Sequence, residues 1–311
     1  MFRYIMKRII YAILTLFVLI TLVFFMERML PGDPFIGEKS VSATTLANMN
    51  AKYGLDKPLI IQYLLYMGNC LHLDLGTSIV YNRDVMSIIS DSFLVSADLG
   101  IRALIFASIA GILLGMIAAL KRGTGWDTFS MFIAMVGVSV PSFILGALFQ
   151  YFLALQLRKV LGFALFPIQG WGKFNQTILP AFALGLGSLA TVSRLMRTST
   201  LDVLGQDYIM TAKAKGLSQS KILRRHVLRN AITPVVTIMG PTVASILTGT
   251  FVIESIFNIP GLGKYFVTSI KDLDYTMIGG TVIFYGGLLI LCTLVVDLLY
   301  VVIDPRVKLE G

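Results

Sequence analysis

Charged residues are scarce in this chain of 311 residues. Only 14% of its residues are charged and 56% are hydrophobic, whereas about 25% of the residues of an average soluble domain are charged. The chain therefore has too little polar surface for a water-soluble fold, and its hydrophobicity excludes intrinsic disorder. Histidine is almost absent, because His72 and His226 are the only two, so the chain cannot build a histidine-rich metal site.

Motifs for covalent chemistry and nucleotide binding are also missing. The segment 258–265 (NIPGLGKY) comes nearest to a phosphate-binding loop, but it lacks the first glycine and the hydroxyl residue after the lysine. The sequence contains neither G-x-S-x-G nor H-E-x-x-H, which gives an intramembrane enzyme little to work with. An ion-coupled carrier would need ionisable residues deep in its apolar segments, and the sequence has few candidates. The candidates Arg194, Glu254 and Asp297 all lie towards the ends of such segments.

Six long apolar runs dominate what is present. Each can cross a hydrocarbon core of about 30 Å. No small-residue cleavage site follows the first run, so we expect it to be retained as a transmembrane helix. The runs lie at residues 9–25, 99–120, 129–155, 178–195, 232–257 and 277–303.

The distribution of charge predicts how these runs are oriented. An even number of spans places both termini on one side, together with segments that carry a net charge of +10, whereas the opposite side is neutral. Asp297, inside the last run, accounts for the remaining negative charge of a chain whose net charge is +9. Because cytoplasmic loops are enriched in Lys and Arg, both termini are predicted to be cytoplasmic. Cys70 and Cys292, the only cysteines, fall in different regions, so we expect no disulfide.

The sequence thus predicts an all-α polytopic membrane protein with six transmembrane helices and cytoplasmic termini. Residues 1–29 form the first helix, 30–98 an extended external segment, 99–303 a five-helix core and 304–311 a cytoplasmic tail. The external segment contains amphipathic stretches at 42–53 and 59–73. It could be a cap on the membrane surface or a docking surface for a partner.

Residues 198–231, between helices 4 and 5, form a cytoplasmic segment with a helix, a glycine corner and a second helix. Helix-forming residues run from Asp202 to Lys215, Gly216 suits a left-handed helix end, and Ser218 can cap the next helix. The second helix, 219–230, would carry an apolar side and separate cations. A basic hairpin can bind anionic lipid headgroups. Small residues around Ala212 and Gly216 instead favour close approach by another protein.

The segment 207–234 resembles the EAA loop of ABC-transporter permease subunits, in the variant of the peptide and nickel branch. Met210 and Arg229 depart from the general EAA consensus in the way that this branch does. Further likeness to the family is found at 31–34, 54–58, 74–78, 140–143, 259–263 and 304–307. The matching residues of the loop are Asp207, Tyr208, Thr211, Ala212, Ala214, Lys215, Gly216, Leu217, Ser218, Arg225, His226, Leu228, Arg229, Asn230, Ala231 and Pro234.

This resemblance implies an importer of dipeptides or oligopeptides in a bacterial-type cell membrane, with this chain as the B-type subunit. It implies a heterodimer with a sister permease, two cytoplasmic ATPase subunits that bind ATP and Mg²⁺, and an external binding protein. The chain itself would bind no cofactor or nucleic acid. The implied ATPase-coupling residues are Asp207, Tyr208, Thr211, Ala212, Ala214, Lys215, Gly216, Ser218, Arg225, His226 and Arg229.

The sequence alone does not select the residues that line the pathway. Prolines at 141, 180, 234 and 241 and glycine pairs such as Gly111/Gly115 permit kinks and tight helix packing. Ser139, Thr242, Ser245 and Thr248 are candidate lining residues, although hydrogen bonding between helices would explain each equally well. An ion-coupled carrier or channel for a small polar solute, and a membrane scaffold that does not transport, remain as alternatives.

Overall fold

A computed structural model describes residues 2–29, 56–248 and 250–303. The regular secondary structure of the described residues is helical, apart from an isolated antiparallel bridge between Thr77 and Asp84. The chain divides into two compact units, one formed by residues 1–95 with 260–311 and the other by residues 96–259. Helix α4 (Val85–Leu120) begins in the first unit and ends in the second.

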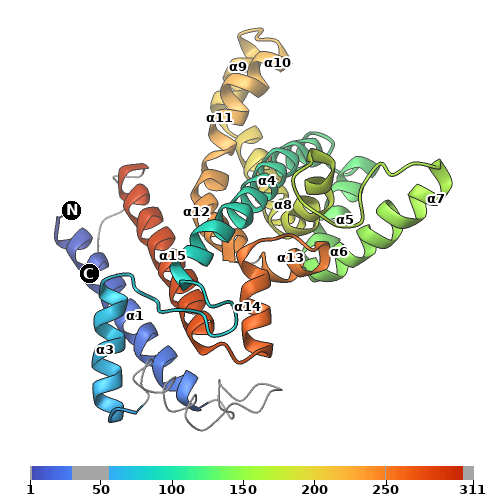
Figure 1. Ribbon diagram of the computed structural model, residues 1–311. Coiled ribbons are helices and arrows are strands. Elements are labelled where there is room, and N and C mark those ends of the chain that lie inside the picture. The colour runs from blue at the N-terminus through green and yellow to red at the C-terminus, as the bar shows by residue number, and fades with distance from the viewer. Residues whose placement is uncertain (1, 30–55, 249, 304–311) are drawn as a thin grey trace. The chain divides into compact units, whose positions relative to one another are not determined.

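The first unit is built on two long antiparallel helices, α1 (Phe2–Met29) and α15 (Tyr275–Ile303) (Figure 1). Glycines of α15 face α1: Glu27 lies against Gly279, and Leu19 against Gly286. Because these positions have no side chain, the two helices can approach closely. Helix α3 (Leu59–Leu71) packs on α1, and α14 (Leu262–Lys271) packs on α15.

A buried carboxylate joins two distant segments of this unit. Asp274, just before α15, is fully buried. Its carboxylate accepts hydrogen bonds from the Ser78 hydroxyl, from the main-chain N–H groups of Ile79 and Val80 at 3.2 Å, and from the Thr276 hydroxyl at 3.0 Å. These donors supply the hydrogen bonds that a buried polar group needs. Asp274 therefore fixes the turn before α4 to the start of α15.

The second unit is arranged around α8 (Phe174–Leu204), which contacts helices that precede it and helices that follow it in the sequence. Its partners are α5 (Gly125–Ser139), α6 (Ser142–Phe149), α11 (Leu228–Ala231), α12 (Thr233–Thr248) and α13 (Phe251–Phe257). A π-helix (Gln150–Gln156) and α7 (Leu157–Leu161) continue α6.

Glycines allow α4 to pack closely on α8. A Cβ added at Gly115 would collide with the Ser193 carbonyl oxygen, and one at Gly185 would lie 2.8 Å from the Ala103 carbonyl oxygen. The aromatic rings of Phe106 and Phe182 stack beside this contact, with centroids 3.9 Å apart. The glycine pairs that the sequence offered for tight packing are therefore used for it here.

The structure supports five to six of the six predicted spans and corrects their bounds. Five helices are long and apolar enough to cross a membrane, or six if the pair 219–231 and 233–247, bent by 47°, forms one span. The second predicted span starts earlier than expected, because α4 begins at Val85. The fifth ends earlier, because α12 ends at Thr248 and α13 is a separate short helix.

The third predicted span, 129–155, is not one helix. Helix α5 ends at Ser139 and α6 begins at Ser142, while Val140 is extended with φ −101° and ψ 123°. Pro141 is the physical cause, because its ring disfavours helical geometry at the preceding residue and it has no N–H to donate. The other interior prolines, Pro180 and Pro241, remain inside α8 and α12.

Candidate coupling hairpin and pathway cavity

The predicted coupling segment forms a compact helical hairpin, here defined as residues 205–231. It consists of α9 (Asp207–Ala214), α10 (Gln219–Ile222), a π-helical turn (Leu223–Val227) and α11. In Figure 1, α9 and α10 lie at the far end of α11 and α12, beyond the other helices of their unit. The first helix is shorter than expected, because α8 continues to Leu204 and Gly205 and Gln206 separate it from α9.

Gly216 forms the corner of the hairpin as the sequence predicts. Its φ is +73°, and its N–H donates to the Lys213 carbonyl at 2.9 Å, while Leu217 N–H donates to the Ala212 carbonyl at 3.3 Å. These bonds close the end of α9 in the manner of a left-handed cap. Ser218 precedes α10, but its side chain makes no capping bond, and its carbonyl accepts the bond from Ile222 N–H instead.

A small apolar core holds the hairpin together. Ile209, Ala212, Ile222 and Val227 are buried in it, with Val203, Leu204, Leu217 and Leu223 packed around them. The predicted apolar side of the second helix is thus confirmed for Ile222, Leu223 and Val227. Ala212 differs from the expectation, because its side chain packs inside the hairpin and offers no surface to a partner. Its small volume instead lets α9 and the following turn pack together.

The remaining predicted coupling residues lie on the outside of the hairpin. Tyr208 accepts a 3.1 Å hydrogen bond from the Asn230 amide, which ties α9 to α11. His226 is half-buried. The other predicted residues are exposed: Asp207, Tyr208, Thr211, Ala214, Lys215, Gly216, Ser218, Arg225 and Arg229. Exposed Lys213, Lys221 and Arg224 add to the positive charge of this surface, which suits an acidic protein surface or anionic lipid.

An ion pair stands at the base of the hairpin. Arg197 of α8 donates from Nε and Nη2 to the two carboxylate oxygens of Asp127 on α5, both at 2.8 Å, and Gly123 N–H donates to the same carboxylate at 3.1 Å. These bonds lower the pKa of Asp127 from its ordinary value of 3.8 to about 2. The sequence gives no sign of this pair, because the two residues are 70 positions apart.

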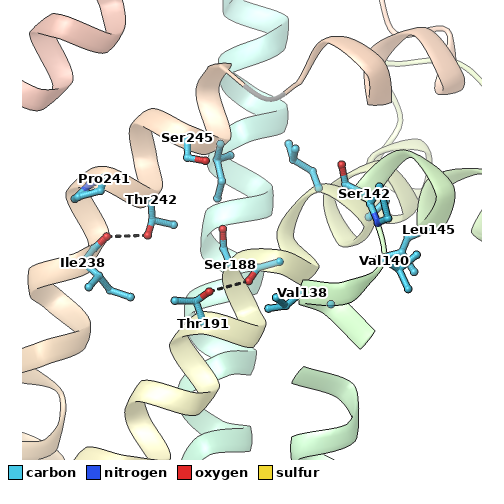
Figure 2. Close-up of a pocket in the computed structure, with 16 residues that line it drawn as sticks. Val138, Val140, Ser142, Leu145, Ser188, Thr191, Ile238, Pro241, Thr242 and Ser245 are labelled. Carbon is cyan, nitrogen blue, oxygen red and sulfur yellow. Dashed lines mark hydrogen bonds between the residues drawn. The ribbon is translucent and has the colours of Figure 1, made fainter. Parts of the chain in front are cut away.

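A cavity of about 600 Å³ lies between the α5–α6 break, α8 and α12 (Figure 2). Its lining contains no charged side chain. Hydroxyl groups come from Ser142, Ser188, Thr191, Thr242 and Ser245, and the rest of the lining is Gly137, Val138, Val140, Pro141, Leu145, Ala183, Leu184, Gly187, Ile238, Pro241 and Ile246. The cavity can therefore offer hydrogen bonds and apolar contacts, but no ion pair.

The two prolines in the lining each remove one helical hydrogen-bond donor. Pro141 and Pro241 have no N–H, so neither can donate the helical hydrogen bond to the carbonyl four residues earlier, at Gly137 and Thr237. Two of the hydroxyls bond within their own helices: Thr191 donates to the Gly187 carbonyl at 3.2 Å and Thr242 to the Ile238 carbonyl at 2.7 Å.

The structure places two of the four candidate pathway residues at the cavity. Thr242 and Ser245 line it, and Ser139 is adjacent to the lining but not part of it. The side chain of Thr248 lies outside the described residues, as does that of Asp297. Sequence reasoning missed Ser142, Ser188 and Thr191. The helix break at Pro141 was the available signal for Ser142, whereas the facing of α8 required its packing.

Comparison with known families agrees with this architecture. Residues 111–309 match the family model described as "Binding-protein-dependent transport system inner membrane component", and residues 1–100 match the N-terminal model of such membrane components. The chain belongs to this family, the membrane permease subunits of ABC transporters, and is an integral inner-membrane protein.

Curated relatives align with the whole chain. This chain is 45% identical over 311 residues to the dipeptide transport system permease protein DppB of Bacillus subtilis, and the alignment covers 100% of this chain and 99% of the relative. It is 42% identical to the oligopeptide transport system permease protein OppB of Salmonella typhimurium, covering 99% and 100%. The predicted resemblance to the peptide branch of ABC permeases is confirmed.

Solved structures support the fold. The methionine ABC transporter MetNI in an inward-facing conformation aligns with a TM-score of 0.53 at 16% identity, covering 70% of this chain and 97% of that chain. The all-helical permease architecture is thus confirmed, while the cytoplasmic placement of the termini remains a prediction from charge.

Proposed function

We propose that this chain is one of two permease subunits of an importer that carries dipeptides or oligopeptides across the bacterial cell membrane. Its similarity over the full length to permeases named for dipeptide and oligopeptide transport carries this proposal. In the proposed assembly a sister permease completes the pathway, an external binding protein delivers the peptide, and two cytoplasmic ATPases bind ATP and Mg²⁺. The chain contributes half of the pathway and no covalent chemistry.

In this mechanism the hairpin receives the motion of the ATPases. Its exposed surface, with Tyr208, Lys215 and Arg225, would dock on an ATPase subunit. The core of the hairpin makes it rigid, and it is continuous with α8 and α12, which line the cavity. Movement of the hairpin would thus tilt two pathway helices and support alternating access. The ion-coupled alternative gains no support from a cavity without charged lining residues.

Deletion of the chain tests the proposed function. Cells that lack it should lose ATP-dependent uptake of radiolabelled dipeptides and tripeptides and regain it when the chain is restored. The chain purified in mild detergent should bring with it a sister permease and ATPase subunits. Uptake by the chain alone in vesicles, driven by an ion gradient, would contradict the proposal.

The neutral cavity predicts how peptide charge affects transport. Introducing a carboxylate by Ser188→Asp should slow uptake of peptides with acidic side chains relative to neutral ones. Two like charges about 8 Å apart at an effective dielectric constant near 20 repel by about 2 kcal/mol, which corresponds to roughly thirtyfold. Uptake of Ala-Glu-Ala, Ala-Ala-Ala and Ala-Lys-Ala gives the measurement. Ser188→Asn is the matched control, and an equal effect of Asp and Asn on all three peptides would contradict the prediction.

A further inference from the structure

We propose that α3 is a re-entrant helix that dips into the membrane beside α1 and faces lipid acyl chains with its outer side. The inference stands apart from the proposed substrate and mechanism, because it concerns only the first unit. It also replaces the expectation that residues 59–73 lie outside the membrane.

The contacts between α3 and α1 show that the two helices are antiparallel. Near the end of α1, Arg28 Nε donates to Gln62 Oε1 at 3.0 Å. Deeper in α1, the Thr21 and Tyr63 hydroxyls lie 2.9 Å apart. Thr21 is eight residues before Met29, the last residue of α1, which corresponds to about 12 Å along the helix. Helix α3 therefore follows α1 back into the span.

An apolar cluster deeper along α1 contacts the second half of α3. Ile20 and Val23 of α1, together with Ile283 of α15, are buried in a cluster against which Tyr66, Met67 and Cys70 pack. Ile20 and Ile283 belong to the two long apolar helices that cross the membrane. The second half of α3 is thus in contact with residues at membrane depth.

The chain enters and leaves α3 on the same face of the membrane. Helices α1 and α15 are antiparallel, with Glu27 beside Gly279 and Leu19 beside Gly286, so the Met29 end of α1 and the Tyr275 end of α15 share one face. After α3 the chain returns there, because the Thr276 hydroxyl donates to the Thr77 carbonyl at 2.8 Å. With 13 residues, α3 is about 20 Å long, too short to cross a core of about 30 Å.

The side chains of α3 are distributed as they are on a lipid-facing helix. Gln62, Tyr63 and Tyr66 point to α1, and the helix has no charged residue; its remaining polar residue, Asn69, is exposed in the last turn. The opposite side is aliphatic and exposed, with Ile60 at 64% and Leu64 at 62% of their full accessibility. Water would solvate such a surface at a cost of about 25 cal/mol per Å², whereas acyl chains would not.

The outer surface of α1 leads directly onto α3. Phe25, exposed on α1, stacks with Tyr63 at a centroid distance of 5.9 Å, and Leu22 and Met26 are exposed beside it in sequence. Because α1 spans the membrane, lipid is the solvent of this surface. The same lipid therefore covers Ile61, Leu64 and Leu65 of α3, which are exposed as well.

Spin-label accessibility tests the depth of α3. Cys70 and Cys292 are replaced by alanine in the full-length chain, a nitroxide is attached at Leu64→Cys, and the protein is reconstituted into phosphatidylglycerol and phosphatidylethanolamine vesicles with the subunits that co-purify. Collision with oxygen, which enriches in acyl chains, is compared with collision with a water-soluble nickel chelate. Leu22→Cys on α1 is the lipid-facing control and Lys57→Cys, just before α3, the aqueous control.

Leu64→Cys should resemble Leu22→Cys, with an oxygen-to-nickel ratio severalfold higher than that of Lys57→Cys. A ratio like that of Lys57→Cys would overturn the proposal in favour of an external segment. Low collision with both reagents would overturn it as well, because a protein partner would then cover α3. Ile61→Cys provides a second position if Leu64→Cys does not assemble.

Discussion

Replacing Gly216 with valine is expected to reduce peptide uptake roughly tenfold or more while the chain still inserts and assembles. Gly216 has a φ of +73°, and a Cβ added there would meet no atom within 4 Å. The penalty therefore comes from backbone conformation alone. A residue with a Cβ pays about 1 to 2 kcal/mol in the left-handed region, and a β-branched residue pays at least the upper figure. At 1.4 kcal/mol per tenfold, the equilibrium constant between the intact and the distorted corner would fall roughly thirtyfold.

Two control variants separate this cause from a general loss of folding. Gly216→Asn should retain most of the uptake, because asparagine tolerates left-handed geometry. Gly205→Ala, at the other turn of the hairpin, should be close to wild type, because Gly205 has a φ of −82° and an added Cβ would make ordinary contacts, 3.6 Å or more away. Equal uptake by Gly216→Val and Gly205→Ala, at equal membrane levels, would show that the corner does not matter.

The structure changes what a substitution at Ala212 would report. The sequence suggested a small residue at a partner surface, but Ala212 is buried with Ile209, Ile222 and Val227. A bulky residue there would overpack the hairpin's own core, at a typical cost of about 1 to 3 kcal/mol. Loss of uptake in such a variant would follow from a distorted hairpin and would say little about docking. Gly216 is therefore the sharper position.

What the sequence predicts well is local. The glycine corner at Gly216 and the apolar side with Ile222 and Val227 depend on neighbouring residues, and both are found. The apolar runs likewise follow from composition, although Pro141 divides one of them. The proline was visible in the sequence, but a proline inside a helix, as at Pro180, looks the same. Packing decides between a kink and a break.

The sequence does not predict which distant residues pair with one another. Asp274 meets Ser78 across 196 positions, and nothing local distinguishes it from the exposed Asp272. The hydroxyls of Ser188 and Thr191 could equally have faced another helix. Their role depends on which side of α8 faces α12, and that rotation is set by glycine contacts such as the one between Gly115 and Ser193. The cavity is thus a property of tertiary packing.

The ion pair between Asp127 and Arg197 connects the hairpin to the cavity in two ways. Arg197 lies seven residues before Leu204, the end of α8, so it is about 10 Å from the hairpin along the same helix. Asp127 is in the first turn of α5, whose last residue, Ser139, adjoins the break at the cavity. The pair therefore holds together the helix that enters the hairpin and the helix that ends at the cavity. Motion of α8 would be passed to α5 through this pair.

Breaking the pair is expected to uncouple ATP hydrolysis from uptake and to destabilise the protein. Asp127 is 7% exposed and the Arg197 side chain 25% exposed, so removing one partner leaves a charge with little access to water. Removing one partner of a fully buried ion pair lowers the free energy of unfolding by about 3 to 5 kcal/mol, and removing one partner of an exposed pair lowers it by less than about 1 kcal/mol. For Asp127→Ala, which lies between these cases, we expect a loss of about 2 kcal/mol. The ratio of peptide imported to ATP hydrolysed by the purified complex should fall severalfold.

A double-mutant cycle with Asp127→Ala and Arg197→Ala, measured by thermal unfolding, isolates the interaction between the two side chains. The matched control is the pair of Asp98 and Arg102 on α4, which is 3.0 Å apart but 44% and 38% exposed. Its coupling energy should be about 0.5 kcal/mol or less. Because the pKa of Asp127 is lowered to about 2, its contribution is complete above its ordinary value near 3.8 and is lost as the pH falls towards 2. The coupling should therefore be the same at pH 5 and pH 8. A coupling energy no larger than that of the control pair, with a normal transport-to-hydrolysis ratio, would show that Asp127 and Arg197 carry no motion between the hairpin and the cavity.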